Sequence, residues 1–488
     1  MADRSPLAAP EPQALPPPDY SRKWLVLSAV GMGIFLSTID GSIVNVAVPT
    51  LERDLGATFA LVQWVVLGYL LTLSSLLLTV GRLADMRGKK NIYLSGFVLF
   101  TLASALCGLA PNIVWLIVFR VLQAIGGAMV AALGSALITE AFPASERGRA
   151  LSYGSVIVSL GIMAGPTLGG LLIQHFSWRS IFYVNLPVGI IGVALVYRFV
   201  PWSPPRPGQR FDAPGALLLF GALLSLLLAL SFSQGAGWRS PLVIGLLLGS
   251  GLLAISFVLA SLRTPQPMVD LHLFRNVLFS VNLVTGVLVF IAMAGSTFLM
   301  PFYLNNVLGY PMQQVGLLLA VVPVGLGLMG PLAGLLSDRF GTRAICVAGL
   351  SLLTVGFVLI STLNTDTTRS GYILRYALVG LGIGLFNAPN NSAIMGAAPR
   401  ERLGIASGLL ALARVLGQTA GVATLGALWA SRVQAATSIP VGADVTSAPP
   451  AALVAGLHDV FLLGAAVVGL ALLLALAALR LEHRRPRD

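Results

Sequence analysis

Long apolar runs, separated by short polar clusters, follow one another along almost the whole chain. Fourteen of these runs are about 20 residues long, the length at which an α-helix crosses the hydrocarbon core of a bilayer. A helix satisfies its own backbone hydrogen bonds, as a membrane span must. The pattern therefore predicts an all-α integral membrane protein with helices at 24–48, 61–80, 92–110, 113–136, 151–173, 181–200, 214–233, 241–262, 278–302, 314–336, 344–363, 373–396, 404–430 and 457–480.

Basic residues are distributed unevenly between the predicted loops. An even number of spans places both termini on one side, and most of the 30 Lys and Arg residues fall in the loops of that side. The opposite loops hold only Arg53, Arg179, Arg239, Arg369 and Arg432. Because Lys and Arg accumulate in cytoplasmic loops, both termini are predicted to be cytoplasmic. The Gly- and Ala-rich, Lys-poor composition is typical of a high-GC bacterium, which predicts a bacterial inner membrane.

The composition also indicates an integral membrane protein. Hydrophobic residues make up 56% of the 488 residues and charged residues 10%, against about a quarter charged in an ordinary soluble domain. The net charge of +12 follows from basic cytoplasmic loops and predicts no nucleic-acid partner. The two cysteines lie in apolar runs and the four histidines are scattered, so neither a disulfide framework nor a metal site is expected.

The loops leave no room for a soluble catalytic domain, since none exceeds about 26 residues. The phosphate-binding pattern GxxxxGK followed by Ser or Thr is missing from the sequence, which argues against an ATP-driven pump. We therefore expect no enzyme activity and no cofactor.

Two loop segments have similar sequences. Residues 81–90 (GRLADMRGKK) and 334–343 (GLLSDRFGTR) follow the second and tenth runs, 253 positions apart (338 − 85). Parallel repeats of this kind build many transporters. They predict two six-helix bundles with two helices inserted between them. The predicted boundaries are 1–22 for a disordered cytoplasmic tail, 23–200 for the N-terminal bundle, 201–270 for the inserted pair, 271–481 for the C-terminal bundle and 482–488 for a second cytoplasmic tail.

Five motifs follow one another along the chain, each in or next to a predicted span. They are Asp40–Pro49, Gly81–Lys90, Leu116–Gln123 (followed by Ala124 where a Gly is usual), Gly161–Gly170 and Trp178–Pro187. On these motifs the chain resembles the fourteen-helix drug:proton antiporter branch of the major facilitator superfamily. The resemblance implies the major facilitator fold and a secondary transporter that exports small hydrophobic or amphipathic compounds in exchange for protons, by alternating access. It also implies a monomer whose partners are the bilayer, the substrate and protons, with the proton gradient as its energy source.

Two charges lie deep in predicted spans at matching depth. Asp40 is about 12 Å and Arg120 about 11 Å from the outer ends of their helices, at 1.5 Å per residue. A charge in mid-bilayer costs at least about 2.5 kcal/mol unless it is paired or faces water, which makes both residues functional candidates. Our hypothesis is that Asp40 exchanges protons and Arg120 tunes that exchange. The alternative is a purely structural ion pair.

The glycine motif of the fifth span has two compatible interpretations. Gly161, Gly165 and Gly169 recur every four residues, so they share one helix face and allow a neighbouring helix to approach closely. Pro166 removes a backbone donor and bends that face, with Gly170 further along it. The motif therefore predicts helix packing, and the resemblance implies that the bend helps to open or close the transport pathway.

The repeated loops also have two interpretations. Their basic residues can act as ordinary cytoplasmic anchors. An Asp at a cytoplasmic helix end can instead bind a neighbouring helix N-terminus or a basic residue and latch the two bundles together. The resemblance assigns this latch role to the following residues: Gly81, Asp85, Gly88, Lys89, Asp338 and Arg339.

Further polar residues are candidates for a substrate cavity. Arg414 and Gln418 are one turn apart in the thirteenth span, and Arg414 either contacts substrate or bonds to carbonyl groups. Asn387 and Asn391 of the twelfth span either bind substrate or join helices by hydrogen bonds. Tyr69 resembles a cavity position of the family.

Other functions remain open. A lipid or amphiphile translocase, or a metabolite exporter, of the same fold would share these features. A non-transporting sensor or scaffold is disfavoured by the matched charges. Uptake symport is disfavoured by the resemblance of the glycine motif to that of antiporters.

Overall fold

The computed structural model describes residues 20–143, 146–202, 212–237, 239–264, 267, 271–397, 403–437 and 445–483. Within these ranges the structure is helical and contains no strand. Fourteen helical segments are long and apolar enough to cross a membrane, as predicted. The helices of the first half and the inserted pair are α1 Lys23–Leu55, α2 Phe59–Arg87, α3 Lys89–Leu109, α4 Ile113–Ala141, α5 Arg147–His175, α6 Ser180–Tyr183, α7 Asn185–Phe199, α8 Ala213–Ala236 and α9 Pro241–Arg263. The helices of the second half are α10 Val277–Phe302, α11 Met312–Leu319, α12 Val321–Phe340, α13 Thr342–Ser361, α14 Arg369–Ala397, α15 Leu403–Ala436 and α16 Pro450–His483.

Several helices are longer than their apolar runs. The first predicted span ends at residue 48, but α1 continues through Pro49 to Leu55 and ends where Gly56 adopts a left-handed conformation with φ 57°. Glycine populates that region at no steric cost, so it ends the helix. Hydropathy locates the part of a helix that lies in the hydrocarbon core but not the turns that extend beyond it.

Two predicted spans are divided in the structure. The span at 181–200 is α6 followed by α7, and the span at 314–336 is α11 followed by α12. Pro187 and Pro323 each lack the backbone N–H that would bond four residues back, to the carbonyls of Tyr183 and Leu319. The carbonyls of Tyr183 and Leu319 therefore lose this hydrogen bond, and α6 and α11 end at these two residues.

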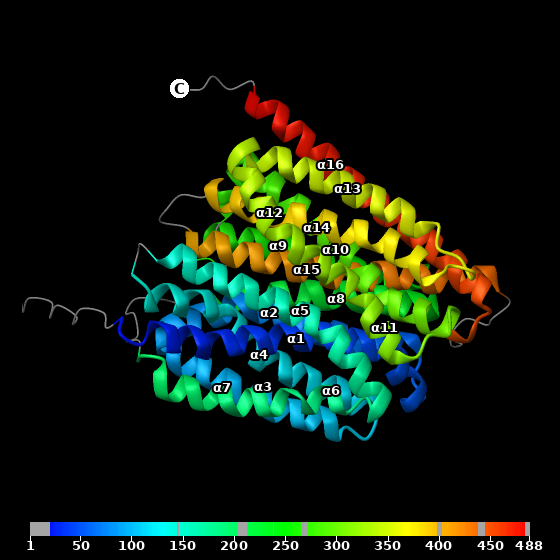
Figure 1. The fold of residues 1–488 in the computed structure, drawn as a ribbon, viewed down its shortest axis with the longest axis horizontal. Helices are drawn as coiled ribbons and strands as arrows, with labels where there is room; N and C mark the ends of the chain where they lie inside the picture. Colours follow the sequence, from blue (N-terminus) through cyan, green and yellow to red (C-terminus); the bar gives the residue numbers. More distant parts are fainter. Residues whose placement is uncertain are drawn as a thin grey trace, which may run out of the picture.

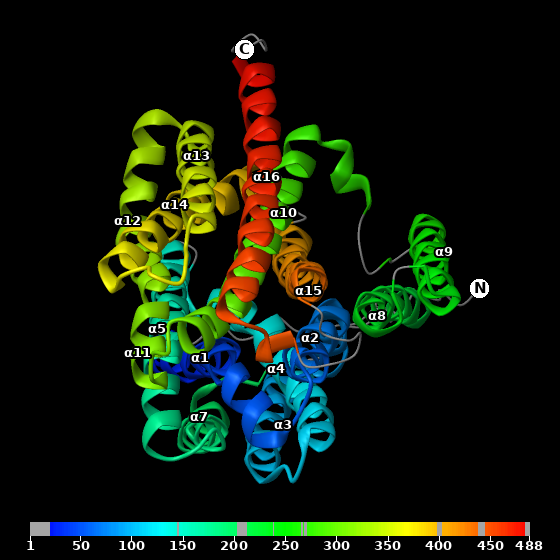
Figure 2. The same ribbon diagram turned by 90° about the vertical axis from the view of Figure 1, so that its right-hand side faces the viewer.

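The chain forms two helical bundles that lie side by side (Figure 1). The helices α1 to α7 make up one bundle and α10 to α16 the other, and the start of α1 and the end of α16 lie at the same end of the molecule, called here the end that carries the termini. The inserted helices α8 and α9 pack on each other, outside the bundles (Figure 2). Of the two, α8 contacts α2 and α15, one helix from each bundle, and so covers one seam between them.

The two bundles share an apolar core at the end away from the termini. Phe59 of α2 packs with Phe298, Phe302 and Trp429 of the other bundle, with ring centroids 5.0 to 5.7 Å apart. At the end that carries the termini lie two separate apolar clusters, one in the N-terminal bundle and one in the C-terminal bundle that also includes Phe257 of the inserted helix α9. The bundles are therefore packed together at one end and have independent cores at the other.

Two contacts fix the packed end. On one seam Gln63 Nε2 of α2 donates a hydrogen bond to the Val422 carbonyl of α15, at 2.6 Å. On the other seam α5 meets α11, where a Cβ added to Gly316 would lie 3.1 Å from Gly170 Cα and 3.1 Å from the Pro166 carbonyl carbon. The glycines allow this backbone-to-backbone approach, as small residues do at membrane helix interfaces.

We expect Gly316→Val to destabilise the packed end by about 1–3 kcal/mol, because overpacked side chains displace the backbones they meet. Gly327→Val is the matched control, since nothing lies within 4 Å of a Cβ at that position on α12. Thermal unfolding in detergent, followed by tryptophan fluorescence, should show a lower midpoint for the first variant than for the control. Equal midpoints would contradict the close α5–α11 contact.

Candidate functional site

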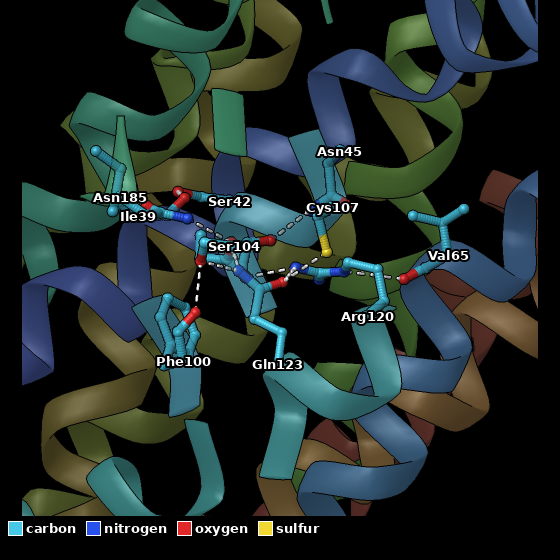
Figure 3. Close-up of polar contacts among 12 residues, drawn as sticks. Ile39, Ser42, Asn45, Val65, Phe100, Ser104, Cys107, Arg120, Gln123 and Asn185 are labelled. Carbon is cyan, nitrogen blue, oxygen red and sulfur yellow. Dashed lines mark hydrogen bonds and ion pairs between the residues drawn. The ribbon is translucent and has the colours of Figure 1, made fainter. Parts of the chain in front are cut away.

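Asp40 is fully buried inside the N-terminal bundle and accepts three side-chain hydrogen bonds. Arg120 Nη1 of α4 donates to Oδ2 at 2.6 Å, while Gln123 Nε2 of α4 and Asn185 Nδ2 of α7 each donate to Oδ1 at 2.9 Å (Figure 3). The carboxylate therefore joins α1 to α4 and α7.

The Arg120 guanidinium is also buried, with 1% of the residue exposed. Its Nη1 donates to Gln123 Oε1 at 2.6 Å and its Nε to the Val65 carbonyl at 3.3 Å. The ring of Tyr69 lies against its flat face, 4.1 Å from Cζ, and Phe182 lies 5.9 Å away. An aromatic face attracts a cation, so the guanidinium is held by a carboxylate and a ring together.

Gln123 extends the network to α3. Its Nε2 also donates to Ser104 Oγ at 2.7 Å, and the Cys107 thiol lies 3.8 Å from its Oε1. Elements α1, α2, α3, α4 and α7 thus converge on one ion pair (Figure 3), and Phe182 brings α6 close to it as well. Breaking a buried pair is costly because the partner left behind is an uncompensated charge. A change in the charge of Asp40 therefore acts on most of the bundle.

The glycine motif of α5 packs beside this pair. Added Cβ atoms at Gly161, Gly165 and Gly169 would meet Thr38, Ser42 and Ile43 of α1 within 3 Å. The Ser42 hydroxyl, two residues from Asp40, donates to the Gly161 carbonyl at 3.2 Å. This face of α5 is a packing surface for α1.

The same helix also reaches the other bundle. Gly170 faces Gly316 of α11, and the Pro166 carbonyl lies against the same glycine. The motif therefore places α5 between the helix that carries Asp40 and the opposite bundle.

The predicted latch residues lie far from this network, at helix ends near the termini. Gly88 and Gly341 have φ values of 92° and 85°, so the two loops share a left-handed glycine at the repeat offset of 253 (341 − 88). Lys89 forms an ion pair with Glu140 at the end of α4. Gly81 is half-buried in α2 and Arg339 is exposed at the end of α12. The side chains of Asp85 and Asp338 lie outside the described part of the structure.

The predicted cavity residues are divided between the two bundles. Tyr69 is buried against Arg120 and so belongs to the ion-pair network. Asn387 and Asn391 on α14, and Arg414 and Gln418 on α15, are half-buried in the other bundle. Arg414 lies over the Phe290 ring, with 5.2 Å between Cζ and the ring centroid.

Gln123 and Asn185 complete the network but are not among the predicted site residues. Both fall in recognised motifs, at the end of Leu116–Gln123 and inside Trp178–Pro187. A polar amide inside an apolar span is the signal that could have identified them, because buried polar groups need partners.

Comparison with known proteins identifies the family. The family model for the Major Facilitator Superfamily matches residues 30–422. The chain belongs to this superfamily. The chain is 36% identical over 411 residues to the riboflavin transporter RibZ of Clostridioides difficile, an alignment that covers 84% of this chain and 89% of the relative. It is 36% identical over 412 residues to the multidrug resistance protein Stp of Mycobacterium tuberculosis (84% and 76%) and 33% identical over 457 residues to the tetracenomycin C resistance and export protein of Streptomyces glaucescens (90% and 85%).

Solved structures of facilitators have the same fold. A bacterial homologue of the human lysosomal transporter Spinster, in an inward-facing and unoccupied conformation, aligns with a TM-score of 0.64 over 96% of this chain and 100% of that one, at 16% identity. The xylose transporter XylE from E. coli, partially occluded and inward open, aligns with a TM-score of 0.63 over 93% and 97%, at 14% identity. By its family the chain is a membrane transporter, as predicted, and its relatives include the tetracenomycin C resistance and export protein.

We expect Asp40→Ala and Arg120→Met each to destabilise the protein by about 3–5 kcal/mol, because each leaves an unpaired buried group. The double variant should be less destabilised than either single variant, since no buried charge remains in it. The exposed pair Arg432–Asp459, at 3.1 Å, is the control and should show a coupling of about 0–1 kcal/mol. Unfolding in mixed micelles measures both cycles, and additive effects at Asp40 and Arg120 would contradict the coupled pair.

Proposed function

We propose that this facilitator is a proton-coupled exporter of small hydrophobic or amphipathic compounds in a bacterial inner membrane. The observation that carries the proposal is the buried Asp40 carboxylate, paired with Arg120 and packed beside the glycine motif of α5. In this proposal the Asp40 carboxylate is the group that exchanges the proton. Such intramembrane acids mark proton pathways in transporters.

The packing supplies a route from protonation to movement. When Asp40 binds a proton it no longer balances Arg120, and the attraction between α1 and α4 weakens. α1 packs through Ser42 on Gly165 of α5, and α5 packs through Gly170 on Gly316 of α11. A shift of α1 is thereby passed to the contact between the two bundles. Proton binding and release would favour different packings of the two bundles, as alternating access requires.

If the end that carries the termini faces the cytoplasm, the structure represents an inward-facing state. Lys and Arg accumulate on the side of the termini, which by the positive-inside rule is the cytoplasm. The bundles have separate cores at that end and a shared core at the other. Substrate would therefore enter from the cytoplasmic side and leave after the packed end opens. A monomer is sufficient for this cycle, with the proton gradient as its only energy source.

The names of the relatives favour two candidate classes of substrate. Export of drugs or antibiotics is favoured by the multidrug resistance protein Stp and by the tetracenomycin C resistance and export protein. A second candidate, export of an aromatic metabolite, is favoured by the riboflavin transporter RibZ, which is 36% identical to this chain. Both candidates use the same proposed proton site.

Ethidium efflux from proteoliposomes, with and without a pH gradient, tests the proposal. Wild-type protein should transport the dye only with the gradient, and Asp40→Asn should reduce gradient-driven transport at least about tenfold, because the exchangeable proton is lost. Asp459→Asn, which changes an exposed acid paired with Arg432, is the control and should transport normally.

Gradient-dependent efflux that persists in Asp40→Asn would contradict the role of Asp40. If neither protein moves ethidium, riboflavin replaces it as the probe, and failure of gradient-driven transport with both compounds would contradict proton-coupled export.

A further inference from the structure

Arg414 of α15 is a cation inside the C-terminal bundle. Its Nε is buried and has no hydrogen-bond partner, and its guanidinium lies 5.2 Å from the Phe290 ring centroid. Gly417, one turn along α15, allows α15 to pack closely on α10 here, since an added Cβ would lie 2.8 Å from Phe290 Cβ. An Arg in the membrane interior faces a large desolvation penalty unless something compensates its charge.

The described acidic side chains of this bundle do not supply that compensation. Asp459 is paired with Arg432, and Asp366 lies in the loop before α14, where it is exposed. Arg120 in the other bundle, by contrast, has Asp40 as its partner. The two bundles therefore differ. The N-terminal bundle contains a neutralised pair, and the C-terminal bundle contains a cation without a carboxylate partner among the described residues.

The two sites lie at similar depth. The hydrogen bond from Gln63 to the Val422 carbonyl fixes the register of α2 against α15. Arg414 is eight residues from Val422 and Tyr69 is six residues from Gln63, both toward the termini. These separations correspond to roughly 12 and 9 Å along the helices. Arg414 therefore lies about level with the ring that contacts Arg120.

Amide groups lie along the same face of α10 as Phe290. Asn282, Gly286 and Phe290 are spaced by four residues, so they share that face. A Cβ added to Gly286 would lie 3.3 Å from Asn390 Nδ2 of α14. Asn282 and Asn390 are both buried. The guanidinium and the Phe290 ring suit an anionic group attached to an aromatic body, and the two buried amides lie one to two turns away along the same face of α10.

We propose that Arg414 recognises an anionic group, such as a carboxylate, on an amphipathic aromatic substrate. The guanidinium binds the anionic group and Phe290 contacts the aromatic part. The inference rests on the proposed export function for the direction of transport. Recognition of the anion is a binding property and does not depend on proton coupling. A purely structural Arg would be expected to use its Nε in a bond to a carbonyl, which this residue does not do.

Binding to purified protein in detergent, without any gradient, tests the proposal. The probes are 2-naphthoate and its neutral carboxamide, 2-naphthamide, together with a panel of larger aryl carboxylates and their carboxamides. Wild-type protein should bind carboxylates at least about tenfold more tightly than the paired amides, as charge-assisted bonds are stronger than neutral ones.

Three variants test whether Arg414 causes the preference for carboxylates over amides. Arg414→Gln should remove it by weakening carboxylate binding while amide binding changes less than about threefold, and Arg414→Lys should retain part of it. Arg375→Gln is the control, because Arg375 bonds to Thr362 and the Gly371 carbonyl near the other end of the bundle.

Wild-type protein that binds no carboxylate of the panel more tightly than its amide overturns the proposal, whether or not the variants fold. Equal losses for carboxylates and amides in Arg414→Gln overturn it as well, since they would indicate a structural role. A carboxylate preference that depends on Arg414, in protein that shows no gradient-driven transport, would support the anion site and contradict proton-coupled export.

Discussion

The ion pair between Asp40 and Arg120 is the interaction on which the N-terminal bundle depends. A single charge in the membrane interior is expensive, and two opposite charges are tolerated only when their geometry and further hydrogen bonds compensate the loss of water. Gln123, Asn185 and the ring of Tyr69 supply that compensation. Buried polar networks of this kind are sensitive to a change in any member, because the low dielectric strengthens every interaction in them.

Small residues connect this electrostatic centre to the rest of the fold. The glycines of α5 allow α1 to approach on one side and α11 on the other, so one helix contacts the proposed proton site and the opposite bundle. The interior is close-packed, and a displacement of α1 cannot be absorbed by empty space. Packing thus couples a local change of charge to the interface between the bundles, while α8 covers the seam between α2 and α15.

Much of the fold could be predicted from the sequence because the bilayer imposes a strong pattern. The fourteen predicted runs correspond to fourteen helical segments of the described residues that are long and apolar enough to cross a membrane, and each repeated loop carries a glycine with positive φ, Gly88 or Gly341. The ends of α1 and the breaks before α7 and α12 could not be predicted from hydropathy, since they depend on Gly56 and on prolines inside apolar runs. The resemblance to the major facilitator superfamily is confirmed over residues 30–422.

The site was less predictable than the fold. Matching depth placed Asp40 and Arg120 at the same level, and the structure adds that their side chains are in contact. Asn185 could have been recognised as a polar amide in an apolar span, but its contact with Asp40 could not be predicted, because it depends on the chain breaking at Val184 and starting a new helix. Tyr69 is a predicted cavity residue, and the structure adds that its ring lies against Arg120. This contact could not be predicted, because tertiary packing decides which face of α2 meets α4.

Infrared difference spectroscopy of the Asp40 carboxyl tests the central claim most directly. Protein in lipid is taken from alkaline to acidic pH, and the spectra of wild type and Asp40→Asn are compared. We predict a band of a buried protonated carboxylic acid that appears in wild type on acidification, shifts when a transported compound binds and is missing in Asp40→Asn. An identical band in both proteins, or no such band at any pH at which the protein transports, would show that Asp40 keeps its charge throughout and would contradict proton exchange at this site.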